Sequence, residues 1–257
     1  MKKTSKIAFI ALAWVVFAIK SVALTAIPNP NPPKPVPCVT NQPPLWSSSI
    51  SVGLTLTRGN SDTTLGDITL KTHRNNLTNE WTLGLEATYG VDHGAKNNES
   101  LQGIAQYNHL FTDRFYGYGR INGFHDAIAD VTYRLTAGPG VGYYLIKHKK
   151  TRMAIEAGPV GVFEKLDGRI EDYPGARVAQ RFERKWNEHA RFWETVDFIP
   201  RFDELNDYLI NAEIGAQALI SKRISLNVVL EDNYIAIPAP SHLDNDMKLI
   251  SGLIFKF

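Results

Sequence analysis

The sequence predicts an all-β protein, an antiparallel up-and-down transmembrane β-barrel of about 12 strands that follows a cleaved N-terminal signal peptide. Three observations predict this fold class. The N-terminus joins a basic stretch to a short apolar run. Most of the chain alternates apolar and polar residues in segments of about ten. The chain also ends on an amphipathic strand whose last residue is aromatic. No internal stretch approaches about 18 consecutive apolar residues, so helical membrane spans are not expected.

The N-terminus has the three parts of a secretory signal. Lys2, Lys3 and Lys6 precede the apolar run Ile7–Ile19, and Ser21-Val22-Ala23 supplies a small-x-small cleavage site. The run is too short for a retained anchor, which needs about 20 residues. We therefore assign residues 1–23 to a signal peptide. Its removal takes four of the 28 basic side chains, against 26 acidic ones. The mature chain is then nearly neutral, and nucleic acid is not expected as a partner.

Residues 24–45 form a proline-rich segment, with eight prolines between Ile27 and Leu45. This composition gives a stiff, extended chain that neither joins a sheet nor packs a core. We expect a periplasmic spacer, with peptide recognition as the alternative. Cys38 is the only cysteine, so it cannot form an internal disulfide. It is interpreted as an incidental thiol or an intermolecular link.

Residues 46–257 are predicted to form the barrel. They consist of short alternating segments separated by Gly, Asn, Asp and Pro clusters. The clearest segment begins at Trp81, where Leu83 and Leu85 alternate with polar residues. Alternation over about ten residues fits a tilted membrane strand. The predicted strands are 46–57, 64–73, 80–90, 100–111, 115–125, 131–145, 151–163, 176–186, 189–199, 208–220, 223–234 and 247–257.

The connections predict the topology. Those after even-numbered strands are tight or modest. Those after odd-numbered strands are mostly longer and more polar, although the first and fifth are not long; the longest are Val91–Glu99, Glu164–Gly175, Pro200–Asp207 and Ile235–Asp246. Outer-membrane barrels have short periplasmic turns and longer external loops. We therefore expect an even strand number, both termini in the periplasm, and Glu164–Gly175 and Ile235–Asp246 facing outward.

The last strand carries a candidate assembly signal. Leu249, Leu253, Phe255 and Phe257 share one face because strand side chains alternate. The ending resembles the C-terminal insertion signal of bacterial outer-membrane barrels, a Gly-x-x-aromatic-x-aromatic pattern that falls here on Gly252, Phe255 and Phe257. The alternative is the edge strand of a soluble sandwich.

The chain also resembles the domain of unknown function 481 family, bacterial outer-membrane proteins described as salt-induced. The resemblance covers roughly residues 46–257 and leaves out the proline-rich segment. It implies an outer-membrane barrel and carries no established activity or ligand. The motifs are Trp46-Ser47, Gly53–Thr64, Arg134–Tyr143, Glu156-Ala157-Gly158-Pro159 and Asp207–Glu213.

The sequence contains no catalytic, phosphate-binding or metal-binding motif that we recognise, and its seven histidines are scattered. We therefore expect no enzyme activity, no cofactor and no metal. The alternatives are an outer-membrane barrel hydrolase and a soluble periplasmic β-domain. Pro139 and Pro159 fall in strand centres at equal distances from a turn near Lys149. Because proline lacks a ladder donor, the pair predicts a bulge or kink in the wall.

Charged residues on the polar faces of the strands carry the functional prediction. A charge that faces lipid is costly, so these side chains are expected to project into the lumen. The lumen-lining candidates are Glu86, Arg120, Arg134, Arg152, Glu156, Arg177, Arg181, Glu183, Arg191, Asp197, Glu213 and Glu231.

Two interpretations of these charges remain, an Arg–carboxylate network that braces the lumen and a lining that selects small polar solutes. Barrels of about eight strands leave no channel and those of about 16–18 leave an open one. A barrel of about 12 strands lies between them, so the strand number does not distinguish the two interpretations. We predict a non-catalytic barrel, structural or a narrow channel for small polar solutes, with a lumen braced by Arg–carboxylate pairs. Its expected location is the outer membrane of a Gram-negative bacterium. The expected partners are outer-membrane lipids and lipopolysaccharide, the barrel assembly machinery and periplasmic chaperones.

Overall fold

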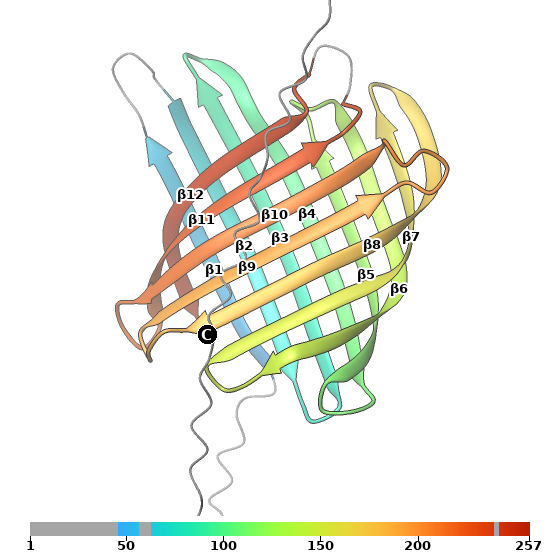
Figure 1. Ribbon diagram of the computed structural model, residues 1–257. Coiled ribbons are helices and arrows are strands. Elements are labelled where there is room, and N and C mark those ends of the chain that lie inside the picture. The colour runs from blue at the N-terminus through green and yellow to red at the C-terminus, as the bar shows by residue number, and fades with distance from the viewer. Residues whose placement is uncertain (1–45, 57–62, 239–241) are drawn as a thin grey trace, which may run out of the picture. The chain divides into compact units, whose positions relative to one another are not determined.

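The computed structural model describes residues 46–56, 63–238 and 242–257 (Figure 1). The predicted signal peptide and proline-rich segment lie outside the described residues. No helix in the described part of the chain is long and apolar enough to cross a membrane. The strands are β1 (Trp46–Leu56), β2 (Thr63–Asn75), β3 (Asn79–Asp92), β4 (Ala95–Leu110), β5 (Phe115–Asp126), β6 (Val131–Lys147), β7 (Thr151–Leu166), β8 (Arg169–Lys185), β9 (Ala190–Pro200), β10 (Tyr208–Leu219), β11 (Ile224–Ile235) and β12 (Asn245–Lys256).

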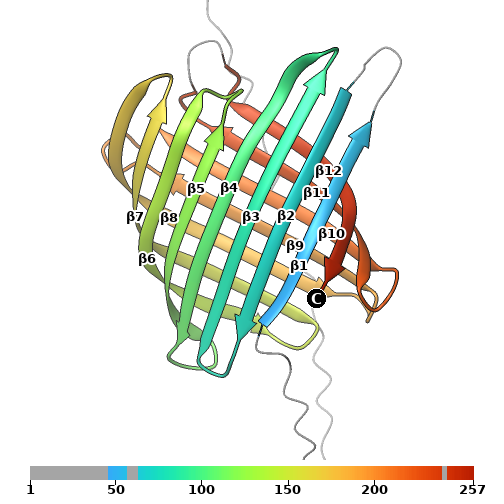
Figure 2. The same ribbon diagram turned by 180° about the vertical axis from the view of Figure 1, so that it is seen from behind.

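These strands form one closed antiparallel barrel, in which each strand pairs with its neighbours in sequence and β1 pairs with β12 (Figures 1 and 2). This confirms the predicted fold class and the even strand number. Such an order places all even-numbered connections at one end, with the start of β1 and the end of β12. We call this end the turn end and the opposite end the loop end.

The strand pattern turns the apolar residues outward. On β3, Leu85 and Tyr89 are 47% and 55% exposed, whereas Thr88 between them is only 4% exposed. A soluble domain would bury the apolar face instead. Outward apolar and inward polar faces are the arrangement of a transmembrane barrel, and they exclude the soluble β-domain as an account of this fold.

Two connections that the sequence predicted to be long are tight turns. The structure turns from β3 to β4 at His93 and Gly94 and from β7 to β8 at Asp167 and Gly168. The φ angles at these four residues are 48°, 79°, 49° and 74°, as two-residue hairpin turns with a positive φ at both central positions require. The predicted lengths of Val91–Glu99 and Glu164–Gly175 were therefore wrong, and most of these residues belong to strands. Asp-Gly at 167–168 is a strong hairpin signal that the polar composition of the segment obscured.

The pairing of the two strand-centre prolines is confirmed. The β6–β7 ladder stops at Ala137↔Gly161 and resumes in the same register at Val141↔Ala157, which places Pro139 opposite Pro159. The wall has an interruption at this level without a register shift. The β6–β7 shifts lie elsewhere, at Val131/Tyr133 and Tyr144/Ile146.

The barrel closes between β1 and β12 at a close backbone approach. The ladder runs from Ser49↔Lys256 to Gly53↔Gly252. A Cβ atom added to Gly252 would lie 2.4 Å from the Val52 carbonyl oxygen, so only glycine fits this position.

Candidate functional site

The lumen is divided into a filled side and a hollow side. Inward side chains of β4 to β9 form a hydrogen-bonded network. Beside it lies a cavity of about 470 Å³, whose lining takes residues from all twelve strands, so that Tyr116 and Arg120 of the network border it as well. The side chains of both the filled side and the hollow side come from the inward-facing positions of the strands.

Glu156 of β7 is the centre of the network, and its side chain is almost fully buried. Its Oε1 accepts hydrogen bonds of 2.9 Å from both the Tyr116 hydroxyl and the Gln106 amide. Its Oε2 accepts one of 2.8 Å from Arg177 Nη1 and lies 3.4 Å from Arg181 Nη2. A buried carboxylate needs such compensation because its charge has lost water.

Arg177 joins this centre to a second carboxylate. Its other terminal nitrogen, Nη2, donates to Asp197 on β9, which also accepts a 3.2 Å bond from Arg120. The planar guanidinium can bind two carboxylates at once, which an ammonium group does less well. The Arg177 guanidinium carbon also lies 5.5 Å from the centroid of the Tyr118 ring, within cation–π range.

Glycines on β6 make room for this network. In the ladders, Tyr116 of β5 is opposite Gly142 of β6, which is opposite Glu156 of β7. A Cβ atom on Gly142 would lie 2.2 Å from Tyr116 Cζ, and one on Gly140 would lie 2.3 Å from Tyr118 Cζ. The two tyrosine rings therefore lie flat over a strand that has no side chains at these positions.

Further contacts fill this side toward both ends. At the turn end, Glu80 accepts hydrogen bonds from the Tyr144 hydroxyl at 2.7 Å and from Asn108 at 3.1 Å. Toward the loop end, Arg134 Nε donates to Glu164 at 2.5 Å. An apolar cluster lies on β7 to β10 near this pair; it consists of Val160, Val162, Tyr173, Ile199 and Leu209.

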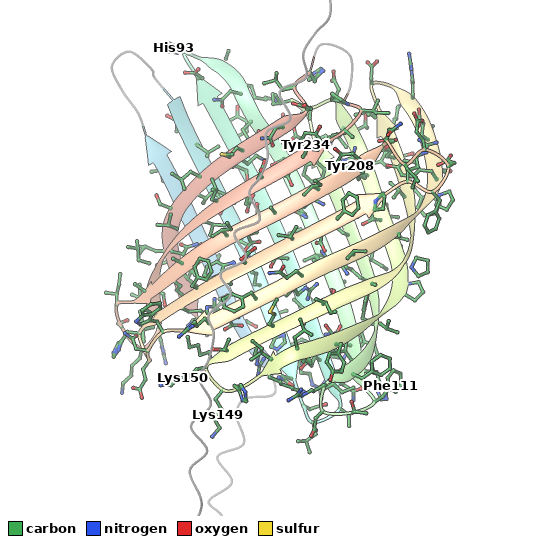
Figure 3. The ribbon with its side chains drawn as sticks, viewed as in Figure 1. His93, Phe111, Lys149, Lys150, Tyr208 and Tyr234 are labelled. Atoms are coloured by element: carbon green, nitrogen blue, oxygen red, sulfur yellow. The ribbon has the colours of Figure 1, made fainter. Side chains whose placement is uncertain are left out.

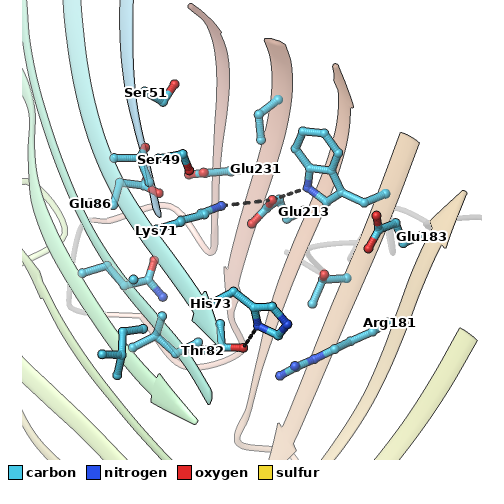
Figure 4. Close-up of a pocket in the computed structure, with 18 of the residues that line it drawn as sticks. Ser49, Ser51, Lys71, His73, Thr82, Glu86, Arg181, Glu183, Glu213 and Glu231 are labelled. Atoms are coloured by element: carbon cyan, nitrogen blue, oxygen red, sulfur yellow. Dashed lines mark hydrogen bonds and ion pairs between the residues drawn. The ribbon is translucent and has the colours of Figure 1, made fainter. Parts of the chain in front are cut away.

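The hollow side presents a group of carboxylates with one ion-paired lysine (Figure 4). Lys71 Nζ of β2 lies 3.7 Å from Glu213 Oε1 of β10, which also accepts a 2.5 Å bond from the Trp193 indole. Glu86 and Glu231 line the same cavity. In Figure 4, Arg181 is drawn at the opposite side of the cavity from Glu86 and Glu231. The cavity is therefore polar and carries both signs of charge.

Several contacts cross the lumen between strands that have three others between them along the wall, among them Lys71–Glu213 and Arg120–Asp197. Lys248 of β12 donates a 3.0 Å hydrogen bond to the Ser100 hydroxyl of β4. Because β1, β2 and β3 lie between these strands along the wall, the bond must pass over the interior rather than along it. Ser100 is close to the start of β4, toward the loop end.

The structure places the twelve candidate residues as follows. Glu156 and Arg177 lie in the buried network, and Arg134 pairs with Glu164, which was not a candidate. Candidates also pair with one another, Arg181 with Glu156 at 3.4 Å and Arg191 with Glu183 at 3.7 Å. The candidates that line the cavity are Glu86, Arg120, Arg152, Arg181, Glu183, Arg191, Asp197, Glu213 and Glu231.

The uncharged members of the network and the lysines of the lumen were not predicted from the sequence. Gln106, Tyr116 and Tyr118 make contacts as central as those of the arginines. Lys71 and Lys248 also occupy inward positions. Their strand alternation was the available signal, because it places them on the same face as the charged candidates. Within the described ranges, no group of three or more His, Cys, Asp or Glu residues is arranged to hold a metal ion.

Comparisons with known proteins find one family model and several similar solved structures. The family model described as "Protein of unknown function, DUF481" matches residues 50–257. Among solved structures, the NanC porin is similar with a TM-score of 0.48 and 10% identity, over 82% of this chain and 98% of that chain. The KdgM porin gives 0.46 and 10%, over 82% and 99%. The translocator domain of the autotransporter NalP from Neisseria meningitidis gives 0.46 and 12%, over 82% and 87%. No curated protein sequence matches the chain.

Proposed function

We propose that this chain, which belongs to the DUF481 family of proteins of unknown function, is a non-catalytic barrel of the bacterial outer membrane whose lumen is a narrow channel for small polar solutes. The observation that carries this proposal is the division of the lumen. A cavity of about 470 Å³ with charged and polar lining runs beside a buried Arg–carboxylate network.

The network explains how a barrel of this size keeps an open space. Twelve strands enclose more interior than side chains of one wall can fill, yet less than a wide pore needs. Hydrogen bonds and an ion pair from three strands, β4, β5 and β8, converge on Glu156 and hold the filled side in place. What remains is a passage for solutes that can exchange water for hydrogen bonds with the cavity wall.

The outer surface supports the membrane location. A closed barrel pairs its backbone groups within the wall, which lipid requires. Aromatic pairs also stand at both ends of the outer face. Tyr208 and Tyr234 stack with ring centroids 5.7 Å apart at the loop end (Figure 3), and Trp81 lies 4.6 Å from Tyr107 near the turn end. Such girdles mark the two membrane–water interfaces of a barrel.

The orientation follows the usual rule for these barrels, in which the short turns are periplasmic. The longer connections, residues 201–207 and 236–244, are both at the loop end. This orientation makes the turn end and both chain ends periplasmic. The barrel assembly machinery, periplasmic chaperones and lipopolysaccharide are then the partners that such a protein meets.

The test is planar-bilayer recording of the refolded barrel. We expect small, steady single-channel conductance that falls when uncharged polar solutes small enough to enter the cavity are added, and that does not fall with solutes too large to enter. A folded barrel that conducts no ions would contradict the proposed channel function. A structural role would then be the remaining interpretation. The hydrolase alternative is tested on the same preparation with lipid and ester substrates, and turnover that survives repurification would favour it.

A further inference from the structure

The turn end is exposed and strongly basic. Its turns and their flanks carry many exposed basic side chains, whereas the exposed acidic side chains of the turns are Asp113 and Glu188. Among the basic residues are Arg114, Lys149, Lys150, Lys185, Lys222 and Arg223. Lys149 and Lys150 stand at the same end as Phe111, opposite His93, Tyr208 and Tyr234 (Figure 3).

Large apolar side chains stand among these charges. Four of the five turns carry one at or near the tip, namely Leu77, Phe111, Trp186 and Ile220, with exposed fractions of 96%, 62%, 75% and 64%. The Arg184 guanidinium carbon lies 5.5 Å from the centroid of the Trp186 ring. Exposing whole Leu and Trp side chains to water is unfavourable relative to burial, so a surface with four such tips is poorly suited to water alone.

The loop end has an excess of the opposite charge. Among the described residues, its turns and their flanks expose Asp130, Asp167, Asp203, Glu204 and Asp244, whereas the exposed basic side chains there are Lys96 and Arg169. Arg201 is partly buried there and binds Asp203 at 2.7 Å. The asymmetry between the two ends is therefore one of sign, and a general excess of surface charge does not account for it.

We propose that the turn end binds the headgroups of anionic phospholipids. Lys and Arg would contact the phosphates, while the apolar tips enter the boundary between headgroups and acyl chains. Basic side chains next to a membrane favour anionic lipid, and aromatic residues favour the interface. An anionic polymer in water would satisfy the charges but would leave Leu77 and Trp186 exposed. The inference rests on the membrane location proposed above and is independent of conductance.

The experiment uses the whole folded barrel in vesicles of phosphatidylcholine. A fixed fraction of either brominated phosphatidylglycerol or brominated phosphatidylcholine is included, and quenching of Trp186 is obtained by subtracting the signal of Trp186→Phe. We expect brominated phosphatidylglycerol to quench Trp186 severalfold more strongly. High salt should remove the difference, because it screens exposed charges.

Two variants compare basic residues of the turn end with basic residues of the loop end. The quadruple variant Lys149→Gln, Lys150→Gln, Lys222→Gln and Arg223→Gln should lose the preference for phosphatidylglycerol. Lys165→Gln with Arg169→Gln, near the loop end, should keep it. Equal quenching by both lipids, or a preference that persists in the quadruple variant, would overturn the proposal. So would lysine-dependent binding to purified peptidoglycan without a lipid preference. Absence of quenching by either lipid would overturn the proposal together with the membrane location on which it rests.

Discussion

The Tyr116 hydroxyl on β5 donates a 2.9 Å hydrogen bond to Glu156 on β7, and its ring crosses the intervening strand at Gly142. The bond therefore joins two strands that are not neighbours in the sheet. A ladder bond holds adjacent strands, whereas this contact fixes the inner face of a three-strand segment. The same geometry recurs one pair further along, where Tyr118 lies over Gly140.

Gly142→Ala should destabilise the barrel through this contact. The new Cβ would lie 2.2 Å from Tyr116 Cζ, so the ring must move and its bond to Glu156 must lengthen. Overpacking of this kind costs about 1–3 kcal/mol. Urea unfolding in detergent, followed by tryptophan fluorescence, measures it. Gly123→Ala is the matched control, since nothing lies within 4 Å of a Cβ there. An equal loss of stability in both variants would show that replacing any strand glycine destabilises the barrel, independently of the contact with Tyr116.

Arg181→Ala should lower stability and raise conductance. Arg181 Nη2 donates to Gln106 at 2.5 Å, lies 3.4 Å from Glu156, and borders the cavity. Its loss leaves Glu156 less compensated, at a cost on the order of 1–3 kcal/mol, and enlarges the passage. The lipid-facing control Leu226→Ala should do neither to the same extent. If stability is unchanged while conductance disappears or changes ion preference, Arg181 selects solutes and does not brace the lumen.

Arg177→Lys should fail to replace arginine. Arg177 binds Glu156 through Nη1 and Asp197 through Nη2, and a single ammonium group cannot reproduce that fork. Breaking a buried pair costs about 3–5 kcal/mol, so we expect a large drop in the temperature at which the folded form is lost on gels. Arg184→Lys on the exposed end of the same strand should be neutral. If the Arg177→Lys barrel is as stable as wild type, a positive charge at this position is enough to stabilise the network, and the shape of the guanidinium is not required.

Barrel assembly should depend on Gly252 and on the terminal aromatic. Gly252→Ala places a Cβ 2.4 Å from the Val52 carbonyl, where β1 and β12 meet. Phe257→Ala removes an exposed aromatic at the end of the closing strand. Both variants should reduce the heat-modifiable form in cells, because an unclosed barrel keeps free strand edges. Gly103→Ala serves as the control, since its nearest atom is a side-chain carbon at 3.9 Å. Wild-type amounts of folded Phe257→Ala would remove Phe257 from the assembly signal.

Cysteine labelling tests the orientation. In a Cys38→Ser background, Asp167→Cys at the loop end should react with an impermeant maleimide on whole cells. Lys149→Cys at the turn end should react only after the outer membrane is broken. The two positions are both exposed and lie on opposite ends of the barrel, so each controls for the other. The reverse pattern would invert the topology.

The sequence predicted strands better than contacts across the lumen. Alternation found every strand, because the period of two is a local property that a lipid-facing wall imposes on each strand separately, but it missed the first residues of β4 and β8. It could not pair Lys71 with Glu213 or Lys248 with Ser100, since residues that face each other across the lumen depend on strand tilt and register around the closed wall. The search for charge also passed over Tyr116 and Gln106. Their contribution depends on the empty positions of β6, which only the fold reveals.

The paired prolines have a mechanical consequence. At Pro139 and Pro159, two adjacent strands lack ladder donors at the same level, while the register on either side is unchanged. We expect this line to act as a hinge, because the wall can bend there without breaking a hydrogen bond. The cross-section of the barrel can then become more elliptical as bilayer thickness changes, with β6 and β7 absorbing the deformation.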